Sequence, residues 1–175
     1  MKNESRKPQL GDVIGIDLGY YQHFGIYVEN NQVIHYHPEE EKERYTILEV
    51  SFERFLQQEE EFYICDFTKF IDMAQQEAED VALHKSLKNL LDPKLNLTEH
   101  FERLTGLYIG FSTGKYKIYS VEETIKRAYS RLGEISDNWF LGQCEHYAFW
   151  CKTGISQEET LNLLIKGIKE QWLRT

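Results

Sequence analysis

The sequence predicts an α+β domain in which a small antiparallel sheet is packed by helices. The first observation is a series of short apolar runs, bounded by turn-forming residues, which is typical of strands. These runs cover residues 13–16, 24–28, 33–36, 46–50 and 62–67. The second observation is a pair of serine-led capping boxes, Ser120–Glu123 and Ser156–Glu159, each followed by apolar residues at helical spacing.

The composition indicates one soluble globular domain. The chain has 175 residues, of which 41% are hydrophobic and 28% are charged. A net charge of −9 argues against nucleic acid or a strongly anionic membrane surface as the main partner. Three cysteines at spacings that match no disulfide scaffold favour a reducing compartment. Without an apolar leader or a long apolar run, we expect a cytoplasmic protein with no transmembrane anchor.

We expect a single domain over residues 1–175, with its core in 10–67 and 116–154. Residues 68–115 are predicted to be an insertion with helices over 70–91 and 98–106, followed by strands at 107–111 and 116–119. This insertion is either a solvated helical excursion or a lid that shapes a substrate site.

The C-terminal segment, residues 155–175, is predicted to be an amphipathic helix. Its apolar stripe packs on the domain, on a second copy of the chain, or weakly on a membrane, through residues 156–173.

The runs 24–28 and 33–36 predict a hairpin with His23 at its entry and His35 in the return strand. A two-residue loop at Asn30-Asn31 would place the two histidines on opposite faces of the sheet, because side chains alternate along a strand. A three-residue loop over 29–31 instead pairs Gly25 with His35 and puts both histidines on one face. We predict the three-residue loop.

Further along, Ser51 is expected to cap a short helix over 52–57. The box at Ser120 opens a helix that Gly133 closes. Its expected apolar stripe consists of Val121, Ile125, Ala128 and Leu132.

Residues 144–152 are predicted to form a helix that ends at Gly154. Cys144 lies in its first turn, where unpaired backbone N–H groups and the positive dipole end favour a thiolate. We therefore expect the pKa of Cys144 to fall below that of a free thiol. His146 is turned about 200° from Cys144 around the helix and cannot be its base.

A thiol needs a nearby base to be a good nucleophile at neutral pH, and that base must be held in one tautomer. His23 and His35 are the histidines that we expect the fold to bring to Cys144. A zinc site built from the same three residues is the alternative, although a fourth ligand and paired ligand spacing are missing. Cys65 is expected to be a buried small residue, and His37, His84 and His100 to be surface residues.

These motifs, in this order, resemble the lecithin:retinol acyltransferase family, which are circularly permuted relatives of papain-like, NlpC-type thiol enzymes. The resemblance covers about residues 10–67 and 116–154. It rests on five short segments: Gly11-Asp12-Val13-Ile14, Tyr21-Gln22-His23-Phe24-Gly25-Ile26-Tyr27, Val33-Ile34-His35, the helix Glu123 to Gly133, and Gln143-Cys144-Glu145-His146-Tyr147. Gln143 and Tyr147 stand where the family has Asn and Phe.

The resemblance implies that Cys144 is the nucleophile, His23 the base and His35 its orienting partner. It also implies an oxyanion site formed by the Cys144 backbone N–H with Tyr21, and supported by Gln143. No cofactor or metal is expected.

The function expected from these residues is a cysteine-dependent acyltransferase or hydrolase that passes through an acyl-thioester on Cys144. Its substrate would be an acyl-bearing small molecule or lipid. A thiol peptidase or amidase with the same triad is one alternative, and a non-catalytic binding domain of the same fold is another.

Overall fold

The computed structural model describes residues 6–19, 21–39, 44–68, 72, 75–76, 114–136 and 143–155. Its centre is a six-stranded sheet with the order β5-β1-β2-β3-β4-β6, in which every neighbouring pair is antiparallel. The strands are β1 (Val13–Asp17), β2 (Gln22–Val28), β3 (Gln32–Glu39), β4 (Arg44–Ser51), β5 (Tyr63–Ile64) and β6 (Ile135–Ser136). Together with the helices this confirms the predicted α+β class, whereas the papain-like permutation stays a prediction.

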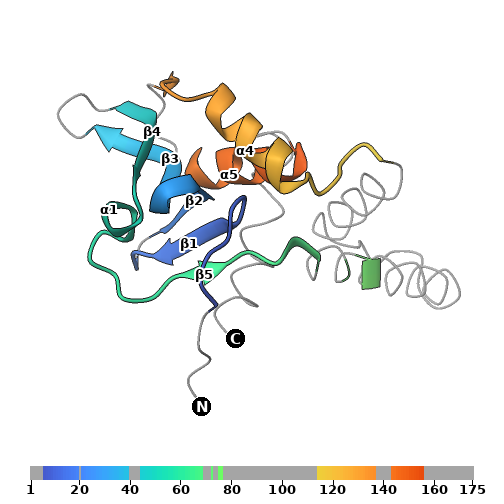
Figure 1. Ribbon diagram of the computed structural model, residues 1–175, viewed down its shortest axis with the longest axis horizontal. Helices are drawn as coiled ribbons and strands as arrows, with labels where there is room; N and C mark the ends of the chain where they lie inside the picture. The colour runs from blue at the N-terminus through green and yellow to red at the C-terminus, as the bar shows by residue number, and fades with distance from the viewer. Residues whose placement is uncertain are drawn as a thin grey trace, which may run out of the picture.

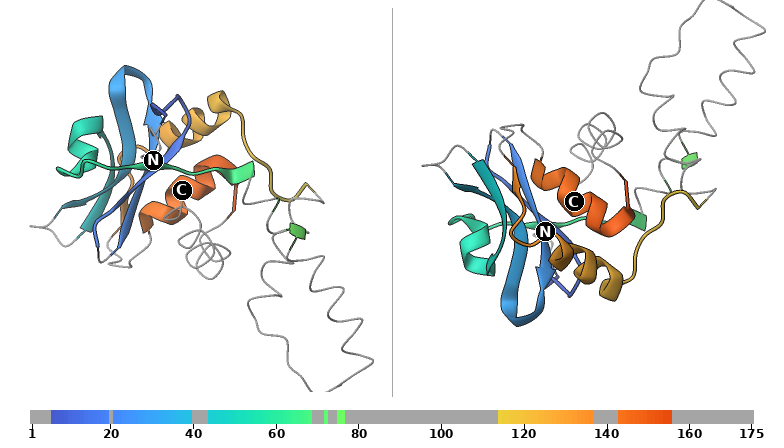
Figure 2. Two further views of the ribbon diagram at one scale, coloured as in Figure 1. Left: turned by 90° about the horizontal axis from the view of Figure 1, so that it is seen from below. Right: turned by 90° about the horizontal axis from the view of Figure 1, so that it is seen from above.

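Helices cover both faces of the sheet (Figures 1 and 2). The short α1 (Phe52–Leu56) lies on one face, and α4 (Val121–Ser130) and α5 (Gln143–Thr153) lie on the other. Alternation along the strands divides the core accordingly. The α1 face is formed by Ile14, Ile16, Val33, Val50 and Phe55, and the α5 face includes Phe24, Ile26, Ile34, Ile47, Tyr147 and Phe149. None of the described helices is long and apolar enough to cross a membrane.

The turn between β2 and β3 has three residues, as predicted. It is a single 3₁₀ turn, Glu29–Asn31, in which Asn30 and Asn31 both have φ of 57°. Asparagine accepts this left-handed conformation more readily than most residues. The resulting register pairs Val28 with Gln32 and Gly25 with His35, so the histidines share the α1 face.

The pairing of β2 with β3 stops at Gly25 and His35, although β2 stays paired with β1 as far as Gln22. Tyr27 donates its N–H to the Asp12 carbonyl, and the Tyr21 carbonyl accepts from Leu18, so the odd-numbered residues of β2 direct their backbone groups toward β1. Gln22 and Phe24 therefore direct theirs toward β3, beyond the point where β3 has separated. We call this opening the β2–β3 split.

The helix starts follow the sequence signals. Ser51 Oγ accepts the Arg54 N–H at the start of α1, and Ser120 Oγ accepts the Glu123 N–H at the start of α4, both at 3.2 Å. At the end of α5, Gly154 adopts a φ of +77° and donates its N–H to the Trp150 carbonyl at 3.0 Å.

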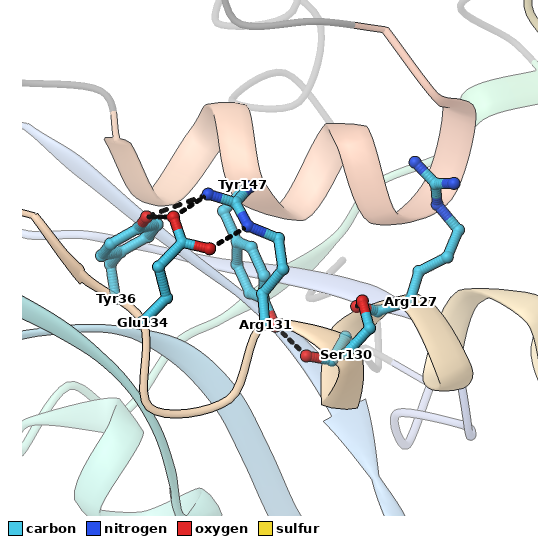
Figure 3. Close-up of polar contacts among 7 residues, drawn as sticks. Tyr36, Arg127, Ser130, Arg131, Glu134 and Tyr147 are labelled. Atoms are coloured by element: carbon cyan, nitrogen blue, oxygen red, sulfur yellow. Dashed lines mark hydrogen bonds and ion pairs between the residues drawn. The ribbon is translucent and has the colours of Figure 1, made fainter.

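Arg127 of α4 and Arg131, the residue that follows α4, hold α5 in place, and Figure 3 shows both extending toward it. Arg127 donates two hydrogen bonds to the Trp150 carbonyl at 3.2 and 3.0 Å, and its guanidinium lies 3.8 Å from the Trp150 ring centroid. Arg131 pairs with Glu134 and lies over the Tyr147 ring. The Tyr147 hydroxyl also donates to the Ala128 carbonyl at 2.9 Å. The helix α5 is therefore joined to α4 at both Tyr147 and Trp150.

Several predicted boundaries are wrong. The strand expected over 62–67 is only two residues long, and β6 was not foreseen. Residues 116–119 form no strand; they run beside the end of α5, where the Tyr119 N–H bonds the Lys152 carbonyl at 2.8 Å. A strand pattern is a weak signal where the partner is a helix end.

The apolar stripe expected on α4 is only partly correct. Ala128 is buried, but Val121 and Leu132 are 47% and 44% exposed. Thr124 is buried instead, because its hydroxyl donates to the Ser120 carbonyl at 2.8 Å and needs no water. The predictions for most of 68–115 and for the helix over 156–173 lie outside the described residues.

Gly25 should be intolerant of a side chain. A Cβ there would overlap Val33 Cγ1 and lie 3.1 Å from Phe55 Cε2. Urea unfolding should show that Gly25→Ala lowers the free energy of unfolding by about 1–3 kcal/mol, the usual cost of overpacking. Because Val33→Ala removes the overlapping methyl, the double variant should lose less than the sum of the two single losses. Strictly additive losses would show that the contact is not the cause.

Candidate active site

Two buried histidines form the first part of the site. His23 on β2 and His35 on β3 are 3% and 1% exposed, and His23 Nε2 lies 2.6 Å from His35 Nδ1. Phe55 of α1 stacks on the His23 ring at 5.3 Å and meets the His35 ring edge-on at 5.4 Å. The pair is therefore joined by a hydrogen bond and enclosed on the α1 side by an aromatic ring.

Burial keeps both histidines neutral. It lowers the pKa of His23 to about 4, with a further contribution from the charge of His37. The pKa of His35 falls well below its ordinary value for the same reason, with added repulsion from His23, His37 and Arg54. At neutral pH each ring thus carries one proton, and His23 can accept another.

The Cys144 sulfur lies in the β2–β3 split. Cys144 is in the first turn of α5, as predicted, and its thiol donates to the Gln22 carbonyl oxygen at 3.7 Å. A backbone hydrogen bond from Phe24 also reaches the sulfur. The Phe24 N–H would bond to β3 if the ladder continued. The same register would place Pro38 opposite Gln22, and proline has no N–H to donate to the Gln22 carbonyl. The thiol therefore lies beside the part of β2 that β3 does not pair, one residue on either side of His23.

The expectation of a lowered pKa at Cys144 is wrong. Burial raises the pKa of the thiol to about 12, and the charge of Glu145 adds to this. Hydrogen bonds from the backbone of Phe24, Glu145 and Cys144 itself act in the opposite direction but are outweighed. The helix terminus alone does not produce a thiolate here, so a nucleophilic Cys144 has to give its proton to a base.

Tyr21 lies beside His23, and its predicted oxyanion role stays a prediction. Its half-buried ring meets the His23 ring edge-on at 6.3 Å. Burial, and next the charge of Cys144, raise the pKa of Tyr21. Gln143 is the first residue of α5, and the prediction for its side chain lies outside the described part of the chain.

Of the other described cysteines and histidines, His37 borders this group. Cys65 and Cys151 are free, buried thiols whose pKa is raised mainly by burial. His146 is buried as well, at 6% exposure. His37 is not the surface residue that was expected: it is half-buried, and its ring lies 5.5 Å from that of His35. His84 and His100 lie outside the described residues.

Sequence reasoning missed the two residues that enclose the histidine pair. Phe55 was expected on the apolar face of its helix, but its contact with both imidazoles depends on where α1 packs. His37 follows His35 by two positions on the same strand, and this spacing is a signal that could have placed it on the same face. In the described ranges no group of three or more His, Cys, Asp or Glu side chains is arranged to hold a metal ion.

A known protein family matches most of the chain. The family model described as lecithin retinol acyltransferase matches residues 6–157. The chain therefore belongs to the lecithin retinol acyltransferase family, whose membership indicates a thiol acyltransferase or hydrolase. No curated protein matches the chain.

The buried histidines should make stability depend on pH. The folded-state pKa of His23, about 4, lies below the unfolded value near 6.5, so the unfolded chain binds more protons between those values. Lowering the pH from 7 to 5 should cost about 2 kcal/mol of unfolding free energy from His23 alone. Urea titrations should show this loss, and His23→Gln should flatten the dependence. An unchanged slope in His23→Gln would contradict the assignment.

Proposed function

We propose that the protein is an acyltransferase or hydrolase in which Cys144 is the nucleophile, His23 the general base and His35 the residue that orients it. The observation that carries this proposal is the position of the sulfur in the β2–β3 split, on the backbone that flanks His23. A thiol held at that position by α5 and a neutral pair of imidazoles on β2 and β3 are the parts that nucleophilic thiol catalysis requires.

The hydrogen bond within the pair selects the reacting nitrogen. His35 occupies His23 Nε2, so Nδ1 is the nitrogen left for the thiol. Nδ1 is also the ring nitrogen nearer to the backbone, and the sulfur lies on the backbone beside His23. The contact between Cys144 Sγ and His23 Nδ1 is the central element of the proposal.

The reaction follows from these positions. As Sγ bonds to the acyl carbonyl carbon, the thiol proton passes to His23 Nδ1, and the charge on the imidazolium is shared with His35 through Nε2–H. The carbonyl oxygen becomes an oxyanion, for which backbone N–H groups in the first turn of α5 and the Tyr21 hydroxyl are the candidate donors. The leaving group departs with the proton from His23, which leaves an acyl-thioester.

An acceptor then resolves the thioester. Its O–H or N–H proton goes to His23 as it attacks, the thiolate of Cys144 leaves, and the proton returns to the sulfur. Water as acceptor makes the reaction a hydrolysis; an alcohol or amine makes it a transfer. We propose an acyl-bearing small molecule or lipid as the donor, because the family is defined by acyl transfer rather than by cleavage of peptides.

An acyl donor should leave a thioester on Cys144. Incubation with a lipid extract, or with a p-nitrophenyl acyl ester, should add the acyl mass to the intact protein, and hydroxylamine should remove it. Cys144→Ser is the matched control and should show no hydroxylamine-sensitive adduct. An adduct on Cys65 or Cys151 in the folded protein would refute the nucleophile assignment.

The rate at which iodoacetamide alkylates Cys144 should depend on the histidines. At pH 7.5 wild-type protein should react first at Cys144, because its sulfur lies on the backbone that flanks the proposed base His23, whereas burial raises the pKa of Cys65 and Cys151. Loss of the base in His23→Ala should slow this about 100-fold. His35→Asn, which keeps a polar partner for His23, should lose less than His35→Ala. Equal rates for all four proteins would exclude these roles, and His146→Ala serves as the control outside the site.

A further inference from the structure

One nitrogen of the buried pair lacks a partner. His35 Nε2 is inaccessible to solvent and has no hydrogen-bond partner among the described residues. A side chain that is 1% exposed cannot satisfy this nitrogen with bulk water. The state of this atom bears directly on whether His23 can act as a base.

The protons in the pair can be arranged in two ways. If His23 Nε2–H donates to His35 Nδ1, then His23 Nδ1 is bare and can take the thiol proton, and His35 carries its own proton at Nε2. If His35 Nδ1–H donates instead, His23 carries its proton at Nδ1 and is not a base. The competent arrangement thus places an N–H at His35 Nε2. Leaving a buried N–H without an acceptor would favour the incompetent one.

The neighbours of His35 leave few acceptors for Nε2. The Tyr36 backbone carbonyl accepts from the His35 ring, but Nε2 still has no hydrogen-bond partner among the described residues. Gly25 and Leu48, its partners in register on β2 and β4, have no polar side-chain atoms. Phe55 offers only the weak acceptor of a ring. Arg54 acts on His35 by its charge, and a guanidinium accepts no hydrogen bond.

His37 is the neighbour that carries a ring nitrogen. It lies two residues further along β3, on the same face, with its ring edge-on to His35 at a centroid separation of 5.5 Å and an interplanar angle of 74°. The corresponding separation within the hydrogen-bonded pair is 4.8 Å. One bridging water, or a rotation of the half-buried His37 ring, would connect a His37 ring nitrogen to His35 Nε2.

We propose that His37 is a positioning residue for the catalytic pair: it accepts the N–H of His35 Nε2, directly or through one water, and so holds His23 in the tautomer that can deprotonate Cys144. This inference rests on the proposed function of His23 and Cys144. The site would then contain three imidazoles in series. They run from His23 beside the buried thiol, through His35, to the half-buried His37 near the end of β3.

This series of imidazoles implies that the reactivity of Cys144 falls in acid. Among the described residues, the charged or titratable side chains outside the pair that act on it are His37 from β3 and Arg54 from α1. When His37 binds a proton it can no longer accept from His35, and its charge opposes protonation of His23. Acidification should therefore slow the reaction of Cys144 by more than the falling thiolate fraction explains.

The test is the rate of Cys144 alkylation by iodoacetamide between pH 5 and 8, measured on the full chain by peptide mass. His37→Leu removes the acceptor and should slow the reaction about tenfold at pH 7.5, the effect of one unsatisfied buried N–H. His37→Gln keeps an acceptor without a titrating charge. It should stay within about threefold of wild type at pH 7.5 and lose the extra fall in acid.

The ¹⁵N shifts of the imidazoles supply a readout that a purely structural role would not move. Wild type and His37→Gln should show His35 protonated at Nε2, whereas His37→Leu should shift the proton to Nδ1. Arg54→Gln is the charge control and should leave the tautomer unchanged. Urea midpoints identify any variant that fails to fold, and the shifts in His37→Gln then decide.

Three results would overturn the inference. The first is a wild-type rate and tautomer in His37→Leu, and the second is equal slowing in His37→Leu and folded His37→Gln. The third is slowing in Thr46→Val alone, which would assign the acceptor to the hydroxyl opposite His37. The proposed function fails separately, if His23→Ala reacts at the wild-type rate. A slow His23→Ala with a wild-type His37→Leu would overturn this inference and leave the proposed function standing.

Discussion

The three-residue turn at Glu29–Asn31 is the constraint on which the site depends. It sets the register of β2 against β3, and a shift of one residue would move His35 to the opposite face from His23. The same register places Gly25 across from His35, where the Val33 and Phe55 side chains fill the space that a Cβ would need. Phe55 can then stack on His23 and close the pair from the α1 side. Turn geometry, backbone space and aromatic packing thus act on the same two imidazoles.

His23, His35 and Cys144 are all neutral in the folded protein at neutral pH. Burial disfavours charge on all three: it lowers the pKa of His23 and His35 and raises the pKa of Cys144. An ion pair between thiolate and imidazolium is therefore not the resting state. In the proposed reaction, charge separation would become favourable only when an oxyanion also develops near the N–H groups of α5. Little reorganisation would then be needed, and a reactive thiolate would seldom be exposed. The Glu145 carboxylate strengthens this preference, because it too raises the pKa of the sulfur.

Local signals predicted much of this structure. The Asn30-Asn31 turn, the serine caps at Ser51 and Ser120 and the glycine after α5 were read correctly, since each depends on a few neighbouring residues. The β2–β3 split was not predictable, because where β3 leaves its partner depends on what packs between them. The pKa of Cys144 was misjudged for a similar reason: the helix position is visible in the sequence, but the degree of burial is a tertiary property. His37 was taken as a surface residue, although alternation along β3 places it beside His35.

The split also gives the sheet a topological role. A continuous sheet separates the side chains of its two faces. Here the Cys144 sulfur lies in the β2–β3 split, between those two layers. The sulfur is carried by α5 on one layer, while the imidazoles and Phe55 belong to the other. In the proposed reaction an acyl group would therefore approach from the α5 layer, while the proton would depart into the α1 layer. Two-sided access of this kind would separate the path of the bulky reactant from the path of the proton. The α5 layer could then vary with the substrate without disturbing the base.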